Sequence, residues 1–252
     1  MTRVVRTTSV LYPVQLRDEM PRETATAYWA GPHAEIVKKN PHIFEYIQRL
    51  FSPSDHGYWP ATERVGTLVA PSWRLDGFAE VRLRNMAAAA LTMPVHMREV
   101  FLDEQNVFRR VLGQMTWPGG GRWWTSGHDD TVDHRTAVLL RRRRGVTGRA
   151  FRNFVHDELG PALCAAGAQD LRTYAFLPFV KLAHATPGVS HDYPSHRRYH
   201  GVLVLGANSR DQVTDLLASP EVSAVLAEQT RVLAAAHAYT IERSVPVIRA
   251  TT

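Results

Sequence analysis

The chain has a single cysteine, very few lysines and no long hydrophobic run. Because Cys164 is alone among 252 residues, no disulfide can form within the chain, and a zinc site built from cysteines is excluded. This cysteine content predicts a cytoplasmic protein. Apolar runs such as residues 87–91 are far shorter than the roughly 18 residues of a membrane-spanning helix. No apolar stretch follows the first ten residues either, so we expect neither a membrane anchor nor a secretory signal.

Lysine is nearly absent although the chain is basic. The formal net charge is +6, and only Lys38, Lys39 and Lys181 among the 30 basic residues are lysines. A basic chain can bind nucleic acid, but an excess of arginine with frequent alanine, glycine and proline is also typical of a GC-rich genome. The one dense cluster, Arg141–Arg144, follows an apolar strand and has no interleaved aromatic residues. We therefore expect an arginine-rich loop tip there and no nucleic-acid partner.

Motifs that bind common cofactors are also missing. The sequence contains no Gly-x-Gly-x-x-Gly, no phosphate-binding loop and no Gly-x-Ser-x-Gly, which argues against nicotinamide, nucleoside triphosphate and serine-hydrolase chemistry. Histidines recur in one Pro/Gly/Ser-rich stretch of the second half, at His184, His191, His196 and His200, but without the spacing of a metal site. We expect no metal and no other cofactor, and we interpret residues 181–198 as a loop that closes over a pocket.

The two halves of the chain carry the same order of structural signals. In the first half we predict strands at about residues 9–12, 44–50 and 77–83 and helices at about 21–39 and 86–110. In the second half we predict strands at about 136–141, 171–180, 200–205 and 239–247 and helices at about 149–165 and 209–237. The pairs Trp29/Val155, Tyr46/Tyr174 and Gly77/Gly201 are separated by 126, 128 and 124 positions. Such a small drift indicates one unit that was copied once.

Each copy has the order β-α-β-β-α-β of a ferredoxin-like unit, whose four-stranded sheet is covered by helices on one face only. The bare face must be buried, and two copies that face each other bury both. The predicted fold class is therefore α+β, with two tandem ferredoxin-like repeats packed sheet to sheet as an intramolecular dimeric α/β barrel. The predicted repeats are residues 1–114 and 136–252, joined by a Trp/Gly-rich connector at 115–135. Formation of a homodimer by two such chains is a further alternative that the sequence leaves undecided.

Three motifs of the first half resemble the EthD-type family of the dimeric α/β barrel superfamily. They are Tyr28-Trp29 with His33 four residues after the tryptophan, Pro41-x-x-x-x-Tyr46-x-Gln48, and Asp76-Gly77-x-Ala79-Glu80. The segment Phe101-Leu-Asp103-Glu104 also resembles the last helix of that family. The resemblance implies the barrel fold. The superfamily includes enzymes that work without a bound cofactor, but its members catalyse many different reactions.

The second half matches these motifs more loosely. Leu159 stands where the first half has His33, and His200 stands where it has Asp76. If both copies were catalytic, both should keep the histidine. We therefore expect one half to hold a catalytic set while the other supplies pocket wall and structure.

Three side chains are candidates for catalysis. His33 lies one helical turn after Trp29 and can transfer protons near neutral pH. Tyr46 can donate a hydrogen bond to a developing oxyanion, and Asp76 can pair with His33. Each also has a purely structural interpretation: a bracing histidine, an aromatic ring packed across the sheet, and a turn-forming Asp-Gly pair.

A second group is expected to line the substrate pocket. Its members are aromatic or histidine side chains: Trp29, His42, Trp117, Trp123, Trp124, Tyr174 and His200. The three tryptophans of the connector flank a run of glycines and can stack on a planar substrate, although they can equally cover a sheet edge.

The favoured function is a cofactor-independent enzyme for a small, largely apolar, oxygenated molecule, such as a polyketide-like or aromatic secondary metabolite in biosynthesis or degradation. His33 would be the general acid or base in cyclisation, isomerisation or dehydration inside a barrel pocket. Two alternatives stay open. One is a non-catalytic accessory protein that binds a small molecule, and the other, less favoured, is a cofactor-free monooxygenase or a haem protein.

Overall fold

The computed structural model describes residues 4–85, 87, 97–125, 127–179 and 186–250. The first half contains β1 (Val5–Thr7), β2 (Ser9–Leu16), α1 (Arg22–Tyr28), the π-helical turn η1 (Trp29–His33), α2 (Ala34–Lys38), β3 (Ile43–His56), the 3₁₀ turn η2 (Pro71–Trp73), β4 (Gly77–Leu83), β5 (Phe108–Val111) and β6 (Gln114–Trp123). Residues 97–104 are also helical. The second half contains β7 (His134–Arg142), α4 (Gly148–Asn153), the π-helical turn η3 (Phe154–Leu159), α5 (Gly160–Ala165), β8 (Gln169–Phe176), the 3₁₀ turn η4 (Ser195–Arg197), β9 (Gly201–Ala207), α6 (Arg210–Ala218), α7 (Pro220–Ala227), the 3₁₀ turn η5 (Gln229–Arg231) and β10 (Leu233–Ile248).

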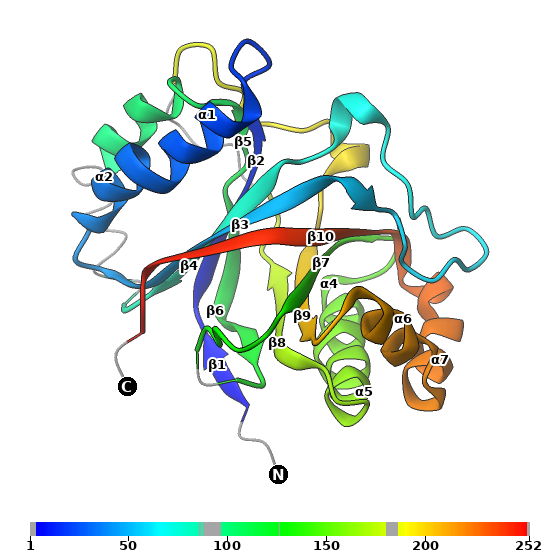
Figure 1. Cartoon of the computed structure of the whole chain (residues 1–252). Coiled ribbons are helices and arrows are strands. Elements are labelled where there is room, and N and C mark those ends of the chain that lie inside the picture. The colour runs from blue at the N-terminus through cyan, green and yellow to red at the C-terminus, as the bar shows by residue number, and fades with distance from the viewer. Residues whose placement is uncertain (1–3, 86, 88–96, 126, 180–185, 251–252) are drawn as a thin grey trace.

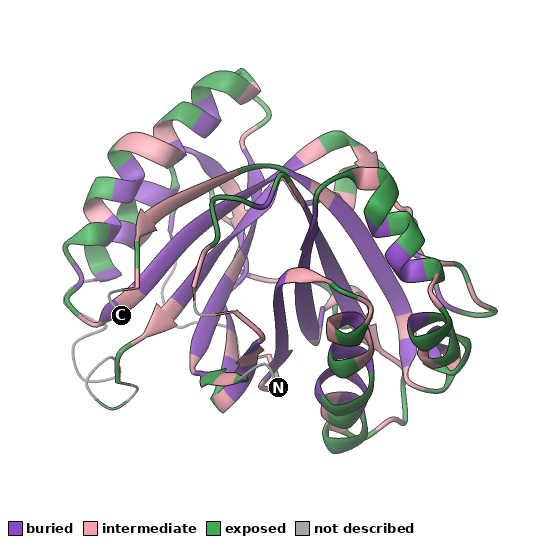
Figure 2. Cartoon of the chain, turned by 60° about the horizontal axis from the view of Figure 1, so that its bottom comes forward, coloured by how far each residue is buried: buried purple, intermediate pink, exposed green. Residues whose placement is uncertain are grey.

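Eight antiparallel strands close into a barrel (Figure 1). Their order around the barrel is β2-β4-β3-β10-β7-β9-β8-β6, and the ring closes because β6 also pairs with β2. The helices lie outside this ring, with α1, α2 and residues 97–104 over the first-half strands and α4 to α7 over the second-half strands (Figure 2). The molecule therefore has the mixed α+β architecture of a dimeric α/β barrel. Within the described residues, every helix is too short or too polar to span a bilayer.

Two seams join the halves of the chain. In the first half β2 pairs with β4 and β6, and β4 pairs with β3; in the second half β7 pairs with β9 and β10, and β9 pairs with β8. The seams are β3 with β10 and β6 with β8. In each half the last strand thus completes its own sheet and also pairs with the other half.

Three segments differ from the sequence-based expectation. In the predicted helix 86–110, the described helical residues end at 104, because residues 108–111 form β5 and pair with β2. The predicted connector 115–135 contains most of β6, because this stretch supplies the strand that closes the barrel against β2 and β8. The predicted helix 209–237 ends at Ala227, and β10 already begins at Leu233. The alanine-rich start of β10 favours a helix by intrinsic propensity, but the pairing of β10 with β7 overrides that preference.

Side chains fill the inside of the barrel. Alternation along β4 sends Phe78 and Glu80 inwards, whereas Ala79 and Val81 pack outwards beneath the helices. The inward apolar residues form one cluster that includes Leu11, Phe51, Phe78, Leu139, Val202, Val204 and Tyr239. These side chains fill this part of the space that the two sheets enclose.

An ionic network occupies the interior next to this apolar cluster. The Glu80 carboxylate accepts hydrogen bonds from Arg49 Nε at 3.0 Å and Arg172 Nη1 at 2.7 Å, and also from the hydroxyl of Tyr174. Arg172 also donates to Asp170 at 3.0 Å. Burial alone would raise the pKa of Glu80, but the two guanidinium groups outweigh it and lower the pKa to about 2. One carboxylate thus binds groups of both halves.

Replacing Glu80 with glutamine is expected to destabilise the fold by about 3 kcal/mol at pH 7, because two buried guanidinium groups lose their shared counter-charge. Urea unfolding measures the change. As the pKa of Glu80 is lowered by folding, its contribution is present above about pH 4.5 and fades as the pH falls towards 2. The difference between wild type and Glu80→Gln should therefore shrink in acid.

Glu63→Gln is the matched control, because it removes a carboxylate whose side chain is 83% exposed. It should change the free energy of unfolding by less than about 0.5 kcal/mol. Equal effects of the two substitutions would contradict a supporting role for the network.

Candidate functional site

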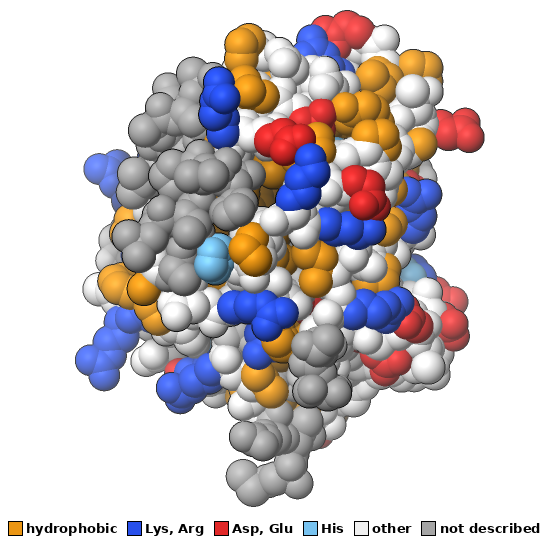
Figure 3. Space-filling view, turned by 90° about the vertical axis from the view of Figure 1, so that its left-hand side faces the viewer, with side chains coloured by type: hydrophobic (Ala, Val, Ile, Leu, Met, Phe, Trp, Pro, Cys, Tyr) orange, Lys and Arg blue, Asp and Glu red, His pale blue; other side chains and the backbone are white. Residues whose placement is uncertain are grey.

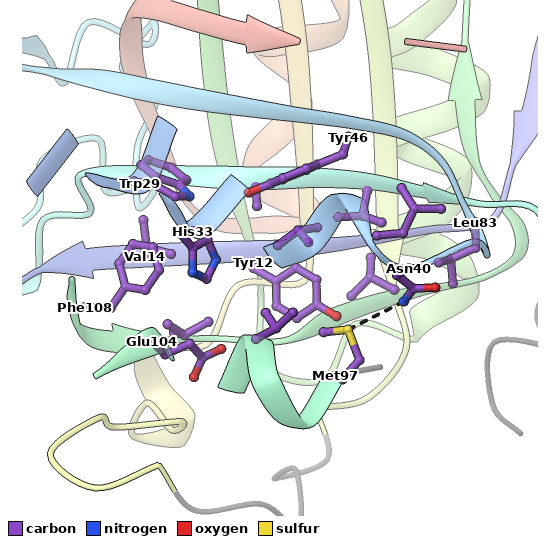
Figure 4. Close-up of a pocket in the computed structure, with 17 residues that line it drawn as sticks. Tyr12, Val14, Trp29, His33, Asn40, Tyr46, Leu83, Met97, Glu104 and Phe108 are labelled. Carbon is purple, nitrogen blue, oxygen red and sulfur yellow. Dashed lines mark hydrogen bonds between the residues drawn. The ribbon is translucent and has the colours of Figure 1, made fainter. Parts of the chain in front are cut away.

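A cavity lies between the first-half strands and the helices that cover them (Figure 4). Its empty space, counted to its open mouth, is about 680 Å³. Most of its lining is aliphatic or aromatic. The polar side chains on the wall are Tyr12, His33, Asn40, Tyr46 and Glu104. An apolar space with a few polar groups suits a small, largely apolar molecule.

The outer surface of the same helices is of mixed charge. Basic and acidic side chains lie close together there around smaller apolar patches (Figure 3). Some of these side chains form ion pairs, such as Lys38 with Glu35 at 2.6 Å and Lys39 with Glu99 at 2.7 Å. The arrangement leaves the apolar face of the helices for the cavity.

A π-helical turn aims the first helix at the cavity. α1 continues through η1 into α2, and Pro32, which has no backbone N–H, lies inside the turn. The turn buries both Trp29 and His33. Trp29 packs on Gly77 of β4, where an added Cβ would meet the indole ring at 3.2 Å. The absence of a side chain at Gly77 therefore lets the helix approach the sheet closely.

His33 is held by a carboxylate from the other first-half helix. Its Nδ1 lies 2.8 Å from Oδ2 of Asp103, and both side chains are buried. With Nδ1–H donated to Asp103, the second ring nitrogen keeps its lone pair, and it has no hydrogen-bond partner among the described residues. His33 thus presents a proton acceptor to the cavity that it lines.

Asp103 is itself fixed by two further donors. Tyr28 donates to Oδ1 at 2.6 Å, and Asn106 donates to the same oxygen at 2.9 Å. Burial acts to raise the pKa of Asp103, but the hydrogen bonds from His33, Tyr28 and Asn106 outweigh it and lower the pKa. A charged Asp103 orients the imidazole and would stabilise its protonated form.

Glu104 is the second carboxyl group at the cavity, and its environment is the opposite. Burial raises the pKa of Glu104 to about 8, and the charge of Asp103 adds to this, while a hydrogen bond from Thr186 opposes it. Nε2 of His191 lies 3.5 Å from its Oε2. At neutral pH Glu104 therefore keeps its proton and can donate it, whereas its neighbour Asp103 is charged.

Two phenols complete the polar wall. The hydroxyl of Tyr46 accepts a hydrogen bond from Gln48 at 2.8 Å, and Gln48 is anchored on the carbonyl of Trp29 at 2.7 Å. Burial raises the pKa of Tyr46 to about 12, and it also raises the pKa of Tyr12 above the ordinary phenol value. Both phenols stay protonated near neutral pH and can donate to an oxygen of a bound molecule.

The structure brings together three of the predicted site residues and separates the rest. Trp29, His33 and Tyr46 line one cavity. Asp76 does not hold His33 as expected, because its oxygens accept from Arg22 Nη1 and from the backbone N–H of Leu16, both at 2.8 Å. Asp103 is the partner instead. His42 lies between α2 and β3, directly before β3, and is not part of the cavity lining.

The aromatic candidates of the connector and second half do not form one pocket. Trp123 lies inside the barrel, where its Nε1 donates to the hydroxyl of Tyr174 at 2.6 Å. Trp124 packs outwards against Gly160 and the second-half helices. Trp117 is 47% exposed and shares a separate surface depression with His200. Stacking of one substrate between the three tryptophans is therefore contradicted.

The second half has no histidine at the position equivalent to His33. Leu159 is fully buried there in the second-half core with Phe154 and Leu163. The loop before β9 instead reaches across to the first half. Thr186 donates to the carbonyl of Phe101 at 2.8 Å, and Ser190 forms two backbone hydrogen bonds with β5. Of the histidines in this loop, His184 lies outside the described residues.

The donor chemistry for a metal is not assembled in the part of the chain that the structure describes. Within those residues, no three His, Cys, Asp or Glu side chains converge as metal ligands would. The expectation of a cofactor-free protein stays a prediction.

Comparisons with known proteins give a fold but not a family. No protein-family model matches the chain, and no curated protein matches its sequence. Among solved structures, a “putative monooxygenase” from Lactobacillus acidophilus NCFM has a TM-score of 0.56 and 9% identity, over 98% of this chain and 97% of that chain. An anthrone oxidase-like protein has a TM-score of 0.56 and 9% identity, over 97% of both chains. Another “putative monooxygenase”, from Fusobacterium nucleatum, has a TM-score of 0.53 and 6% identity, over 96% of this chain and 95% of that chain.

At these identities the similarity shows the fold alone. The present chain shares the architecture of these solved structures along nearly its whole length. The specific EthD-type resemblance is not shown by them.

The raised pKa of Glu104 can be tested without a substrate. Unfolded Glu104 releases its proton near pH 4.5 and the folded group near pH 8, so wild-type stability should fall as the pH rises between these values. Glu104→Gln lacks this loss, so its stability relative to wild type should increase by a few kcal/mol across the same range, at about 1.4 kcal/mol per unit of pKa shift. Urea unfolding at pH 5 and pH 8 measures this.

Glu99→Gln provides the control on the same helix, since the Glu99 side chain is 57% exposed. Its stability relative to wild type should not follow that pH trend. Parallel pH profiles of wild type and Glu104→Gln would show that Glu104 is charged at neutral pH.

Proposed function

We propose that the chain is a cofactor-independent enzyme that moves a proton on a small, largely apolar, oxygenated molecule in the cavity beneath the first-half helices. The observation that carries the proposal is the pair formed by His33 and Asp103, which leaves one imidazole nitrogen as a proton acceptor on an apolar cavity wall. This is the arrangement that a general base requires: an oriented imidazole, a fixed tautomer and a carboxylate to stabilise the imidazolium.

The acid for the same reaction would be Glu104. A base that removes a proton next to a carbonyl leaves negative charge on the carbonyl oxygen, and a neutral carboxylic acid can donate to that oxygen. The raised pKa of Glu104 keeps it protonated at neutral pH. Tyr12 or Tyr46 would position the same oxygen, as expected for Tyr46 from the sequence. Two carboxyl groups of adjacent residues would thus have opposite roles because their surroundings differ.

The enolate formed in this way has several fates. Loss of a hydroxyl group gives dehydration, return of the proton elsewhere gives isomerisation, and attack on a second carbonyl gives cyclisation. The apolar walls would exclude water and fix the conformation of a polyketide-like or aromatic substrate. These reactions share the first step, so the roles of His33 and Glu104 do not depend on the choice.

A second candidate is cofactor-free oxygenation, and the names of the similar structures favour it. Two are described as monooxygenases and one as anthrone oxidase-like. An electron-rich enolate can react with dioxygen, and the net change converts a methylene to a carbonyl with uptake of one O₂ and release of one water. The cavity would serve this reaction through the same proton transfer.

Three finer features belong with this proposal. We propose that the two halves descend from a duplicated ferredoxin-like unit, supported by the repeated order of elements and by the paired π-helical turns η1 and η3. Membership of the EthD-type family rests on the motifs around His33, Tyr46 and Gly77. A cytoplasmic location rests on the low cysteine content.

Anthrone is a suitable probe, because its methylene protons are acidic and its carbonyl is conjugated with two rings. In D₂O without oxygen, the protein should accelerate exchange of the methylene protons, as followed by NMR. His33→Gln should lower the protein-catalysed rate by about 100-fold or more, since general bases contribute factors of this order. Asp103→Asn should also lower it, because the imidazole loses its charged partner.

His134→Gln is the control, since His134 lies at the start of β7 away from this cavity. It should exchange anthrone at the wild-type rate. Uptake of O₂ in air that depends on His33 would select oxygenation over the other fates. An unchanged exchange rate in folded His33→Gln would exclude His33 as the base, and ligand-induced stabilisation without exchange would favour the binding-protein alternative.

A further inference from the structure

A second hollow lies at one end of the barrel, away from the proposed active site. It is bounded by residues 66–73 of the loop between β3 and β4 and by residues 193–199 before β9. Its empty space is about 930 Å³, counted to its open mouth. The wall consists of Gly66, Leu68, Val69, Ala70, Trp73, Arg141, Tyr193, His196, Arg197, Tyr199 and His237. This wall contains two arginines, two histidines and three aromatic rings, but no carboxylate.

The two arginines have no counter-charge of their own. Arg141 donates to the carbonyl of His196 at 2.8 Å, and Arg197 lies over the ring of Trp73 at 4.2 Å. Neither forms an ion pair with a described carboxylate, and Nε of Arg197 is buried without a hydrogen-bond partner. The adjacent Arg198, in contrast, is paired with Asp192 at 2.9 Å. The positive charge at this end of the barrel is therefore available to a ligand.

A buried histidine marks the floor of the hollow. His237 of β10 is only 7% exposed, and its Nδ1 lies 2.7 Å from the hydroxyl of Tyr199. When that hydroxyl donates, the other ring nitrogen carries the hydrogen, and it has no partner among the described residues. Burial lowers the pKa of His237 to about 4, and the charges of Arg141 and Arg197 add to this effect. Both guanidinium groups thus act on the same imidazole.

The aromatic side chains form the wall beside these donors. Trp73 and Tyr193 meet edge to face with ring centres 5.1 Å apart, and Arg110 lies against both rings. The hydroxyl of Tyr193 is anchored on the carbonyl of Trp73 at 3.1 Å. Tyr193 is only 2% exposed and holds Trp73 in place, so this preorganised wall offers the partly exposed indole of Trp73 to a flat molecule.

We propose that this barrel-end hollow is a second ligand site, distinct from the His33 cavity, that binds a small planar anion of the aromatic carboxylate class. Arg141 and Arg197 bind the carboxylate, for which a guanidinium has the matching planar geometry. The free N–H of His237 donates to the same group, and the indole of Trp73, held by Tyr193, packs against the ring. The site explains the first arginine of the 141–144 cluster, which points to this hollow and not only to solvent.

Calorimetric titration of the full chain with 2-naphthoate tests the proposal. The wild type is expected to bind it, and Arg141→Gln and Arg197→Gln should each weaken binding by about tenfold or more, as loss of a charge-assisted hydrogen bond does. Arg231→Gln removes an exposed arginine elsewhere and should leave affinity within about twofold. His33→Gln should also bind normally, which keeps this site separate from the proposed catalytic one. Ring ¹⁵N signals of His237, identified by their loss in His237→Gln, should shift on binding.

Three outcomes would overturn the proposal. The first is no binding of 2-naphthoate at millimolar concentration. The second is equal affinity for the neutral 2-naphthalenemethanol, which would show that the charge is not recognised. The third is equal weakening by Arg231→Gln and Arg197→Gln, which would show only general attraction by a basic surface. Inorganic phosphate that binds as tightly as 2-naphthoate would likewise overturn the aromatic class.

Discussion

The buried carboxylate of Glu80 is the interaction on which the barrel depends. It comes from the first half, and it binds Arg49 of the same half together with Arg172 and Tyr174 of the second half. Each half alone would expose a sheet face, and Arg172 and Tyr174 would lose the Glu80 carboxylate that they share with Arg49. Burying a guanidinium without a partner is costly, whereas the shared carboxylate satisfies two of them in one place. The two halves therefore form one cooperative unit, in which neither inner face is complete by itself.

Filling the barrel has a consequence for where ligands can bind. The inner faces are occupied by the ionic network and by the apolar cluster around Phe51 and Phe78. Space remains in the layer between strands and helices and at the end of the barrel. In the helical layer, the π-helical segment η1 directs His33 towards the sheet. Helical residues 97–104 supply Asp103 and Glu104 opposite His33. The position of the proposed active site thus follows from how the barrel is closed.

Much of the fold could be predicted because it depends on local pattern. The order of strands and helices can be inferred from short hydrophobic periodicities. That order in turn implies two bare sheet faces that must be covered. The contribution of β6 was not predictable in this way, because its Trp-Pro-Gly-Gly run looks like a linker and becomes a strand only through pairing with β2 and β8. Consecutive Trp123 and Trp124 could have been separated from sequence alone, since neighbours on a strand point to opposite faces.

The site was predictable only in part, for a similar reason. Trp29, His33 and Tyr46 lie on motifs that are close in sequence, and they do share a cavity. The carboxylate partner of His33 comes from 70 residues further along, and nothing in local spacing distinguishes Asp103 from Asp76. The only signal was the resemblance of residues 101–104 to a family's last helix. The role of Glu104 depends on burial, which a linear pattern does not report.

The two halves differ in the layer between their strands and helices. In the second half, Leu159 and the packing of Trp124 on Gly160 fill the layer that is hollow in the first half. The buried side of α7 presents Val222 and Leu226, where residues 97–104 present two carboxyl groups.

A histidine at position 159 would therefore be buried without a charged partner, so one substitution could not restore a second site. The second half instead sends Thr186 and His191 to Glu104 of the first. The second half is thus the more completely filled of the two, and it also contributes side chains beside Glu104 of the first.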